Sequence, residues 1–381
     1  MHVEAAAVRP ELTPRTAHVQ NDPCPRLALN VVSIPKGRPV TTGRSLVASA
    51  TVGARFLPVW LAMGVLAIVA AAIAPRALQS TSWAFVLPYM TILALAALGQ
   101  MLVIMQAGID LSTPAVISFG GNLIVGVSLG QNDRLALGLL ACIGLGAGVG
   151  LVNGILVAIV RLNPLIVTLA VGQIVAAWSL HYGQSNTNSL AVPEALTSWA
   201  GQKPLGISAV FWTGAGLTLA IAFLLRFTAA GRRFQAVGAN PSAAWMAGLR
   251  VRTHVVLAYT AAGLLYSFAA ILLAGIRINV DPQFGAEYLL APIAAVVIAG
   301  ASLSGGLASA TSTWVAALAL TLLPQMLLIL GLSLALKYIV FGAAIIVGML
   351  VSGDRVAALL GRLMRPKDPA PGPVELGNNP S

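Results

Sequence analysis

Long apolar runs follow one another from Phe56 almost to the end of the chain, separated by short polar or Gly/Pro-rich breaks. A helix that crosses a bilayer needs about 20 mainly apolar residues. We therefore predict an all-α, polytopic membrane protein with about ten transmembrane helices, although eight to eleven fit the same pattern. The expected spans are 56–75, 83–106, 114–130, 135–160, 164–182, 207–226, 255–276, 288–303, 307–330 and 335–352. The third and eighth are short and adjoin Gly/Ser-rich breaks, which are tolerated where a helix is buried among others.

Polar tails flank this apolar region. Residues 1–55 hold seven basic and three acidic residues, and six prolines fall between Pro10 and Pro39. No apolar stretch of about 7–15 residues follows the early charges, which argues against a signal peptide. The expected organisation is a disordered tail over 1–55, a transmembrane domain over 56–352 and a second tail over 353–381.

Charge is scarce and unevenly placed. Only 9% of residues are charged and 58% are apolar, whereas an ordinary globular chain is about 25% charged, so a soluble enzyme is excluded. With both termini in the cytoplasm, 17 of the 22 basic residues fall on the cytoplasmic side, and the bias persists without the N-terminal tail. The net charge of +11 therefore reports membrane topology and does not indicate nucleic-acid binding.

The sequence lacks the motifs of an enzyme or an ion-driven pump. It contains no HExxH, no GxSxG and no Cys/His ligand spacing, and Cys24 and Cys142 form no disulfide framework. No expected span carries an acidic or His residue near its centre, which argues against proton coupling. The nearest string to a P-loop, at 37–45, has the wrong glycine spacing and an Arg in place of the Lys. We predict no catalytic residue, no metal and no cofactor, and if ATP drives transport, another polypeptide must hydrolyse it. A sodium-coupled carrier with backbone and hydroxyl ligands stays compatible with the sequence.

Glycines recur along one face of the fourth expected span. Gly146, Gly150 and Gly154 are spaced four apart, and Gly144 and Gly148 are further glycines of the same stretch. Since lipid tails give no hydrophobic drive between helices, close backbone contact is a main source of their association. The glycine face predicts helix packing in preference to a ligand site.

The cytoplasmic loop 226–254 is the longest inside loop and carries five basic residues. Asn240 can cap a short helix that starts at Pro241, and Gly248 suits the position just after its end. Ala244, Trp245 and Leu249 then present an apolar surface to a partner protein. The alternative is an interfacial helix that Trp245 anchors among the lipid headgroups.

Five sequence blocks, in order over about residues 85–350, resemble the ribose-type ABC importer permeases. They comprise Gly99-Gln100 with Gly108-Ile109-Asp110-Leu111-Ser112, Gly150 to Gly154 with Asn153, Asn163 to Leu169, Thr228 to Leu249, and Ile293 to Gly306. The chain departs from the family pattern at Ala107, Pro114, Ala299 and Ala308 and in its long N-terminal tail.

The resemblance implies a permease subunit in the bacterial inner membrane that translocates a monosaccharide or a close relative. Its partners would be an ATP-hydrolysing ABC subunit, a periplasmic substrate-binding protein and a second, identical or different, permease subunit. Within loop 226–254 the family's contact with the ATPase maps onto Gly231, Arg232, Gly238, Asn240, Ala243, Ala244 and Gly248. The structural motifs map onto Asp110, Ser112, Asn153, Gly154, Ser302, Gly305 and Gly306.

Polar residues inside the spans are candidates for a translocation path. They are Ser118, Asn122, Thr168, Gln173 and Ser179, and for each the competing interpretation is a hydrogen bond between helices. Asp110 is expected at the cytoplasmic mouth of the second span, where it suits the N-terminus of the third span as a cap. Two other functions stay open: a secondary carrier that acts alone, and an ABC permease for a branched-chain amino acid or a nucleoside.

Overall fold

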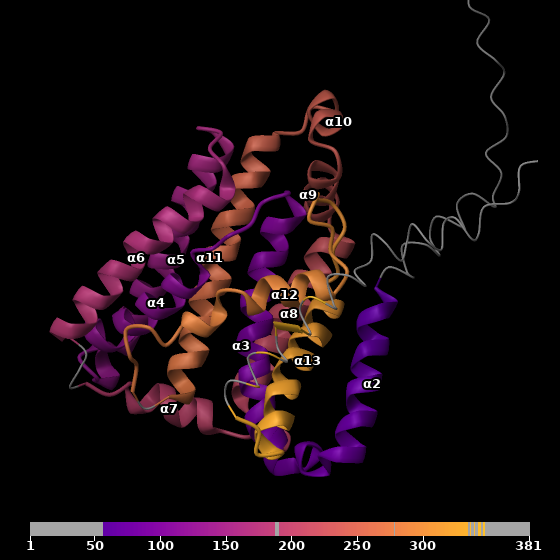
Figure 1. Ribbon diagram of the computed structural model, residues 1–381. Coiled ribbons are helices and arrows are strands. Elements are labelled where there is room, and N and C mark those ends of the chain that lie inside the picture. The colour runs from indigo at the N-terminus through magenta and orange to yellow at the C-terminus, as the bar shows by residue number, and fades with distance from the viewer. Residues whose placement is uncertain are drawn as a thin grey trace, which may run out of the picture. The chain divides into compact units, whose positions relative to one another are not determined.

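The computed structural model describes residues 56–186, 190–277 and 279–333 and five scattered positions between 336 and 346. Both expected tails and most of the expected span 335–352 therefore lie outside the described residues. All described residues belong to one compact unit, Leu46–Ser381, and every regular element in them is a helix (Figure 1). The prediction of an all-α protein is confirmed for this part of the chain.

Six of the described helices are long and apolar enough to cross a membrane. They are α3 (Ser80–Met105), α5 (Leu135–Ala158), α6 (Pro164–Asn186), α8 (Ala209–Phe227), α11 (Val251–Ile276) and α13 (Ala310–Ile329). Three further expected spans coincide with the shorter helices α2 (Leu57–Ile73), α4 (Thr113–Ser128) and α12 (Ala291–Ile298). The polytopic membrane protein is confirmed, whereas the count of ten spans stays a prediction.

The eighth expected span, 288–303, is wrong as a continuous helix. Only the eight residues of α12 are α-helical, after the single turn η4 (Ala286–Tyr288). The chain then reverses through Gly300, Gly305 and Gly306, whose φ angles of +90°, +94° and +91° suit glycine alone. A short helix between irregular segments is compatible with a membrane where other helices bury it.

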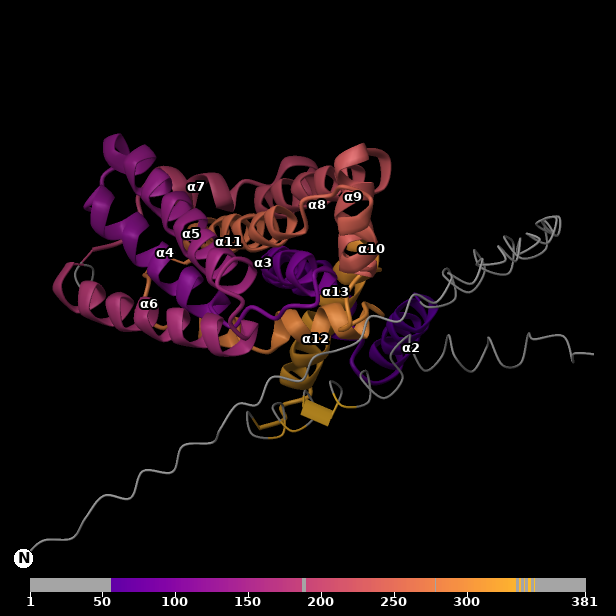
Figure 2. The ribbon, with the colours of Figure 1, turned by 90° about the horizontal axis from the view of Figure 1, so that it is seen from above.

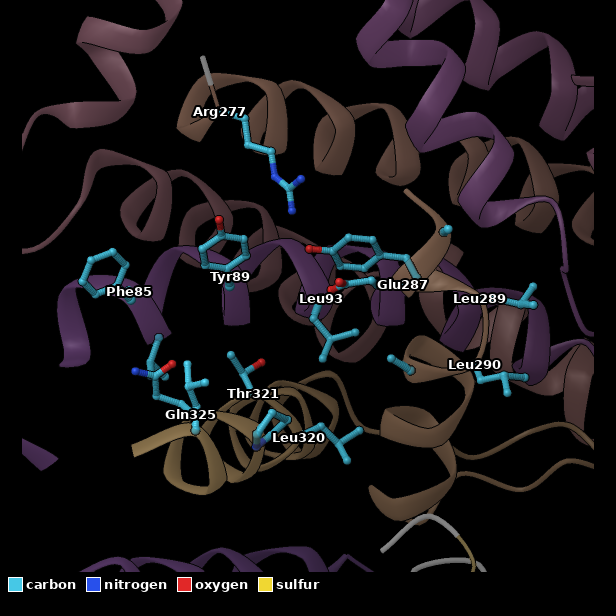
Figure 3. A pocket seen from close by; sticks show the side chains of 16 residues that line it. Phe85, Tyr89, Leu93, Arg277, Glu287, Leu289, Leu290, Leu320, Thr321 and Gln325 are labelled. Carbon is cyan, nitrogen blue, oxygen red and sulfur yellow. The ribbon is translucent and has the colours of Figure 1, made fainter. Parts of the chain in front are cut away.

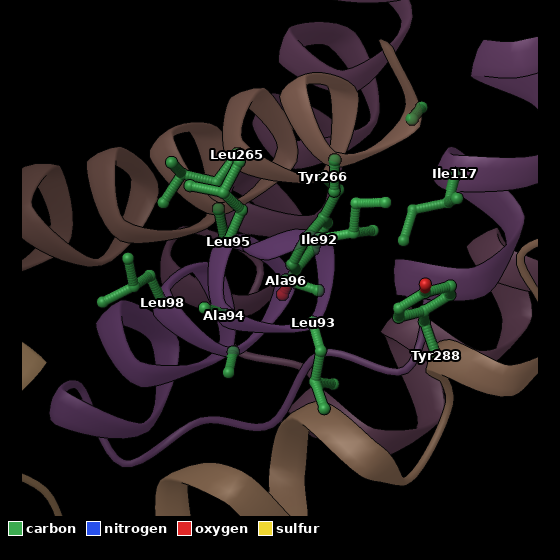
Figure 4. Close-up of a cluster of buried hydrophobic side chains, with 14 of the residues drawn as sticks. Ile92, Leu93, Ala94, Leu95, Ala96, Leu98, Ile117, Leu265, Tyr266 and Tyr288 are labelled. Atoms are coloured by element: carbon green, nitrogen blue, oxygen red, sulfur yellow. The ribbon is translucent and has the colours of Figure 1, made fainter. Parts of the chain in front are cut away.

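Helix α3 lies at the centre of the unit (Figure 2). Of its most apolar 18-residue stretch, 89% is buried. It packs against α8, α11, α12 and α13. Side chains such as Ile92, Leu95 and Leu98 fill the core beside Leu265 and Tyr266 of α11 (Figure 4). Because α3 meets neighbours all round, it is apolar on every face and shows no amphipathic stripe.

The most extensive helix contact joins α5 to α11. A Cβ at Gly146 would overlap the Gly263 carbonyl oxygen, and one at Gly150 would overlap the Tyr259 carbonyl oxygen. At Gly154 it would lie 2.8 Å from the Cα of Val256. The predicted packing role of this glycine face is confirmed, since any side chain there would separate the two backbones.

Two halves of the unit repeat the same order in opposite directions. In each half a long helix, α3 or α11, leads through an irregular segment into a short apolar helix, α4 or α12, with a proline in its first turn. The short helix of each half packs on the long helix of the other half. Since α3 ends and α11 begins at the end of the unit that carries α9 and α10, the two long helices are antiparallel (Figure 1).

Two helices outside the expected spans were not predicted. In loop 226–254 the structure has α9 (Ala229–Ala239) as well as the expected short helix, now α10 (Pro241–Met246). Thr228 caps α9, because its Oγ1 accepts a hydrogen bond of 3.0 Å from Gly231 N. At the opposite end lies α7 (Glu194–Gly201). The single-turn helices η1 (Pro75–Leu78), η2 (Asn132–Arg134) and η3 (Pro204–Gly206) complete the connections.

Candidate functional site

The caps that the sequence predicts for α10 are confirmed. Asn240 Oδ1 accepts a hydrogen bond of 3.0 Å from Ala243 N, and Pro241 opens the helix. At the other end Gly248, with φ +80°, donates to Trp245 O at 2.9 Å, and Leu249 N donates to Ala244 O at 3.0 Å. These two bonds form a Schellman motif, so a helix of under two turns is fixed at both ends by its own sequence.

The exposed apolar surface of α10 differs from the expected one. Trp245 is 72% exposed and Met246 is 76% exposed, whereas Ala244 is only 5% exposed. Ala244 therefore packs inward and the prediction that it contributes to a partner surface is wrong. Met246, which the sequence analysis did not select, takes its place beside Trp245. We call Trp245 and Met246 the α10 tip.

Three segments that are distant in sequence meet in what we call the junction. Its residues are Met105 and Gln106 at the end of α3, Phe234 and Gly238 in α9, and Gly305 and Gly306 after α12. Met105 O accepts a hydrogen bond of 2.9 Å from Gly306 N, and a Cβ at Gly238 would overlap the same oxygen. Gln106 Nε2 donates to Phe234 O at 3.0 Å. The motif glycines Gly238, Gly305 and Gly306, far apart in sequence, are thus packed together.

The remaining residues of the expected coupling loop occupy separate places. Gly231 is buried in the first turn of α9, where a Cβ would lie 2.5 Å from the Cα of Leu225 in α8. Arg232 is exposed and donates from Nη1 to Phe227 O at 3.3 Å. Ala243 and Gly248 are exposed on α10 and just after it. Ser302 helps to close the loop before the junction, with its N–H 3.4 Å from Leu307 O.

Asp110 lies in the irregular segment 106–112, which directly follows α3, and is only 1% exposed. Its expected place at the cytoplasmic mouth of the second span stays a prediction. Its Oδ1 accepts hydrogen bonds from Ser112 N at 2.9 Å and from Ser112 Oγ at 2.6 Å. Ser112 is the N-cap residue of α4, so the carboxylate does not bond N–H groups of the helix itself as a cap would. Asn153 Nδ2 of α5 donates to Ser112 Oγ at 3.0 Å and ties the segment to that helix.

The backbone around Asp110 is held from α3 as well. With its amide in the orientation that satisfies both ends, Gln100 donates to Asp110 O at 3.0 Å and accepts from Asp110 N at 3.2 Å. Burial raises the pKa of the Asp110 carboxyl to about 6, although the two hydrogen bonds from Ser112 lower it. The carboxyl is thus a buried ionisable group.

The polar residues expected in a translocation path fall into three groups. Ser118, Asn122 and Ser179 connect α4 and α6 to segment 279–285. Asn122 Nδ2 donates to Ser179 Oγ at 2.9 Å, and Ser179 Oγ donates to Pro282 O at 2.9 Å. Ser118 Oγ accepts a hydrogen bond of 3.0 Å from Gly285 N. Thr168 Oγ1 accepts from Leu111 N at 3.0 Å. Gln173 lies apart from both groups, exposed on α6. Ser118, Asn122, Thr168 and Ser179 therefore bond between segments, and their role in translocation stays a prediction.

A cavity of about 880 Å³ opens between α3, the η4–α12 segment and α13 (Figure 3). Tyr89 and Tyr288 present aromatic rings to it, and Arg277, Glu287 and Gln325 add polar groups. Neither Arg277 nor Glu287 is among the candidate residues predicted from the sequence. Their sequence positions could have indicated a polar site, because Arg277 and Glu287 are among the few charged residues beside the apolar spans.

Comparison with known proteins identifies the class. A family model described as "Branched-chain amino acid transport system / permease component" matches residues 82–349. The ribose import permease of Bacillus subtilis (strain 168) is 31% identical over 304 residues, which cover 78% of this chain and 92% of the relative. The L-arabinose permease of Azospirillum brasilense is 30% identical over 68% of this chain and 76% of the relative. The fructose import permease of Rhizobium meliloti is 32% identical over 70% of this chain and 76% of the relative. No solved structure matches the chain.

The chain belongs to this family of transport-system permease components. It is a multi-pass inner-membrane protein, and the relatives named above include ribose and fructose import permeases and an L-arabinose ABC transporter permease.

Proposed function

We propose that this protein is the membrane-spanning subunit of an ABC importer for a monosaccharide. The observation that carries the coupling role is the α10 tip, because two large apolar side chains are held out from the unit by a rigidly capped helix. Exposed aromatic and methionine side chains are typical of the centre of a protein interface. The occupant we propose for this surface is a separate ATP-hydrolysing subunit, since the sequence contains no nucleotide site of its own.

The junction offers a route from α10 into the membrane. A displacement of α10 moves α9, whose Phe234 and Gly238 contact Gln106 and Met105 at the end of α3. Residues 106–112 follow directly and lead into α4. Because packed segments move as rigid bodies between discrete arrangements, a shift at the α10 tip reaches α4 through bonded and touching groups.

The charge pattern supports a cytoplasmic position for the α9–α10 end. Five basic residues lie from the last turn of α8 to the first turn of α11: Arg226, Arg232, Arg233, Arg250 and Arg252. Short loops rich in Arg and Lys stay in the cytoplasm. We propose ten spans with both termini on that side, a second permease subunit that completes the pore, and a periplasmic binding protein at the opposite end. No catalytic role is proposed for the chain.

The cavity suits a sugar in transit. It lies at the end of the unit away from α9 and α10, where the binding protein would deliver the cargo. Tyr89 and Tyr288 offer flat apolar faces to the C–H groups of a sugar ring, while Arg277, Glu287 and Gln325 offer hydrogen bonds to hydroxyl groups. Three relatives that share most of the chain are permeases for ribose, L-arabinose and fructose, which favours a pentose or hexose as cargo.

Uptake in cells tests the proposed function. The chain is expressed with the ATPase and binding protein encoded beside it, in a host without its own pentose and hexose importers, and is offered labelled ribose, arabinose, fructose and leucine. We expect uptake of one of the sugars that stops when the P-loop Lys of the ATPase is replaced. Uptake of leucine alone would contradict the cargo. Sugar uptake by the purified chain alone in liposomes, driven by an ion gradient, would favour a secondary carrier.

Within that assay, Glu287→Gln is expected to reduce the maximal uptake rate about tenfold. A hydrogen bond to a charged group contributes about 1.5–3 kcal/mol, and each 1.4 kcal/mol changes a rate by about tenfold. The sugar concentration for half-maximal uptake should not change, because the binding protein sets it. The matched control is Glu194→Gln, an exposed carboxylate of α7 that does not line the cavity. Equal rates for both variants and the wild type would remove Glu287 from the path.

A further inference from the structure

Three buried side-chain oxygens around segment 106–112 have no hydrogen-bond partner in the protein. They are Asp110 Oδ2, Asn153 Oδ1 and Tyr259 Oη, and they are the complete set of such atoms among the described residues. None of the three side chains is more than 1% exposed. Because a buried polar atom without a partner costs about 1–3 kcal/mol, three of them in one region call for a physical explanation.

The three side chains converge from three elements. Asn153 of α5 bonds Ser112, whose hydroxyl bonds Asp110, so the amide and the carboxylate share one neighbour. The Tyr259 hydroxyl reaches from α11 to the backbone of Gly108, where a Cβ would overlap it. The Asp110 charge also acts on the Tyr259 ring hydroxyl. Segment 106–112 thus contacts both α5 and α11, and it carries or touches each of the three side chains with an unpartnered oxygen.

The local charge is unbalanced. Among the described residues no Lys, Arg or His forms an ion pair with Asp110, and its hydrogen-bond donors are neutral. An ionised carboxylate that is buried without a counter-charge is costly, and a cation of single charge would neutralise it.

We propose that Asp110 Oδ2, Asn153 Oδ1 and Tyr259 Oη bind an alkali-metal cation, sodium or potassium. Hard cations take oxygen ligands from carboxylates, amides and hydroxyls. One carboxylate with two neutral oxygens matches a single positive charge better than a double one. The site needs no cluster of His, Cys, Asp and Glu, and none is present in the described part of the chain. The cation fixes segment 106–112, and with it the start of α4, against α5 and α11.

Thermal unfolding of the full chain in lipid nanodiscs at pH 8 tests this site. The salts are sodium, potassium and choline chloride at equal ionic strength, so that general screening is the same in all three. We expect the unfolding midpoint to rise to a plateau with sodium or potassium and to stay lower in choline, because a ligand that binds only the folded state stabilises it. Tyr259→Phe, which removes one ligand oxygen and keeps the ring, should raise the half-saturating cation concentration at least tenfold.

Two matched variants separate the site from general effects. Tyr266→Phe also removes a buried hydroxyl from α11, one that hydrogen-bonds Gln100. In this variant the unfolding midpoint should depend on sodium or potassium as it does in the wild type. Asp110→Asn should abolish the dependence, whereas the exposed Asp133→Asn should preserve it. If Asp110→Asn does not accumulate, the comparison of the two Tyr→Phe variants decides alone. Equal midpoints in all three salts, or a wild-type response in Tyr259→Phe, would overturn the proposal and favour a bound water.

Discussion

Gly150→Leu is expected to prevent the assembly of a folded unit. A side chain at this position enters the contact between α5 and α11, where the carbonyl oxygen and Cα of Tyr259 and Thr260 leave no room for even a Cβ. The obstacle is backbone, which cannot rotate away as a side chain does, so the two helices must separate. We expect a loss of about 3 kcal/mol or more, at the upper end of overpacking costs. The measurement is the yield of monodisperse protein after detergent extraction, followed by its unfolding midpoint.

Gly148→Leu is the matched control. It makes the same exchange two residues earlier in α5, and no heavy atom beyond its own helix lies within 4 Å of a Cβ built there. Its face of α5 points away from α11, so leucine should be tolerated and should gain a little helix propensity over glycine. The yield of folded Gly148→Leu protein should therefore be much higher than that of Gly150→Leu. If the two variants give equally low yields of folded protein, the glycine content of α5 matters for folding, and the close contact at Gly150 does not.

Features that depend on neighbouring residues in sequence were predictable. Apolar runs of about 20 residues set six membrane-length helices with ends close to the expected ones. The α10 caps followed from Asn240, Pro241 and Gly248, because a capping bond joins residues three or four apart. Spacing of four also identified the packed glycine face of α5, since helical geometry alone places those residues together.

Features that depend on distant segments were not predictable from one sequence. Asp110 lies two residues after Gly108 in a connection beside a span end, and nothing in this local sequence shows that Gln100, Asn153 and Ser112 surround it in a buried site. Gly238 lies in a basic loop, and its sequence context does not show that the backbone of Met105 packs directly against it. The cavity is a third case, because α3, the η4–α12 segment and α13 form it together. In each case the deciding partner is more than 40 residues away or on another element.

Trp245→Ala is expected to uncouple the importer without unfolding it, and this prediction rests on the proposed function. Trp245 is 72% exposed at the α10 tip, so its removal costs the unit little packing. Large aromatic anchors at the centre of an interface contribute about 2 kcal/mol or more, which lowers affinity about 30-fold. We expect the isolated permease to keep its unfolding midpoint, while binding of the ATPase subunit weakens by that factor and uptake falls with it. Trp60→Ala, an exposed tryptophan of α2, is the control and should bind the ATPase normally.

Gly238→Ala should fail at a different step, because the added Cβ overlaps Met105 O inside the junction and leaves the α10 tip unchanged. We expect this variant to bind the ATPase with nearly wild-type affinity but to transport little sugar, since α9 can no longer seat against the end of α3. Pull-down of the ATPase and uptake, measured on the same preparations, then separate contact from transmission. Normal ATPase binding by Trp245→Ala would remove α10 from the interface. Normal uptake by Gly238→Ala would show that the path to α4 does not pass through the junction.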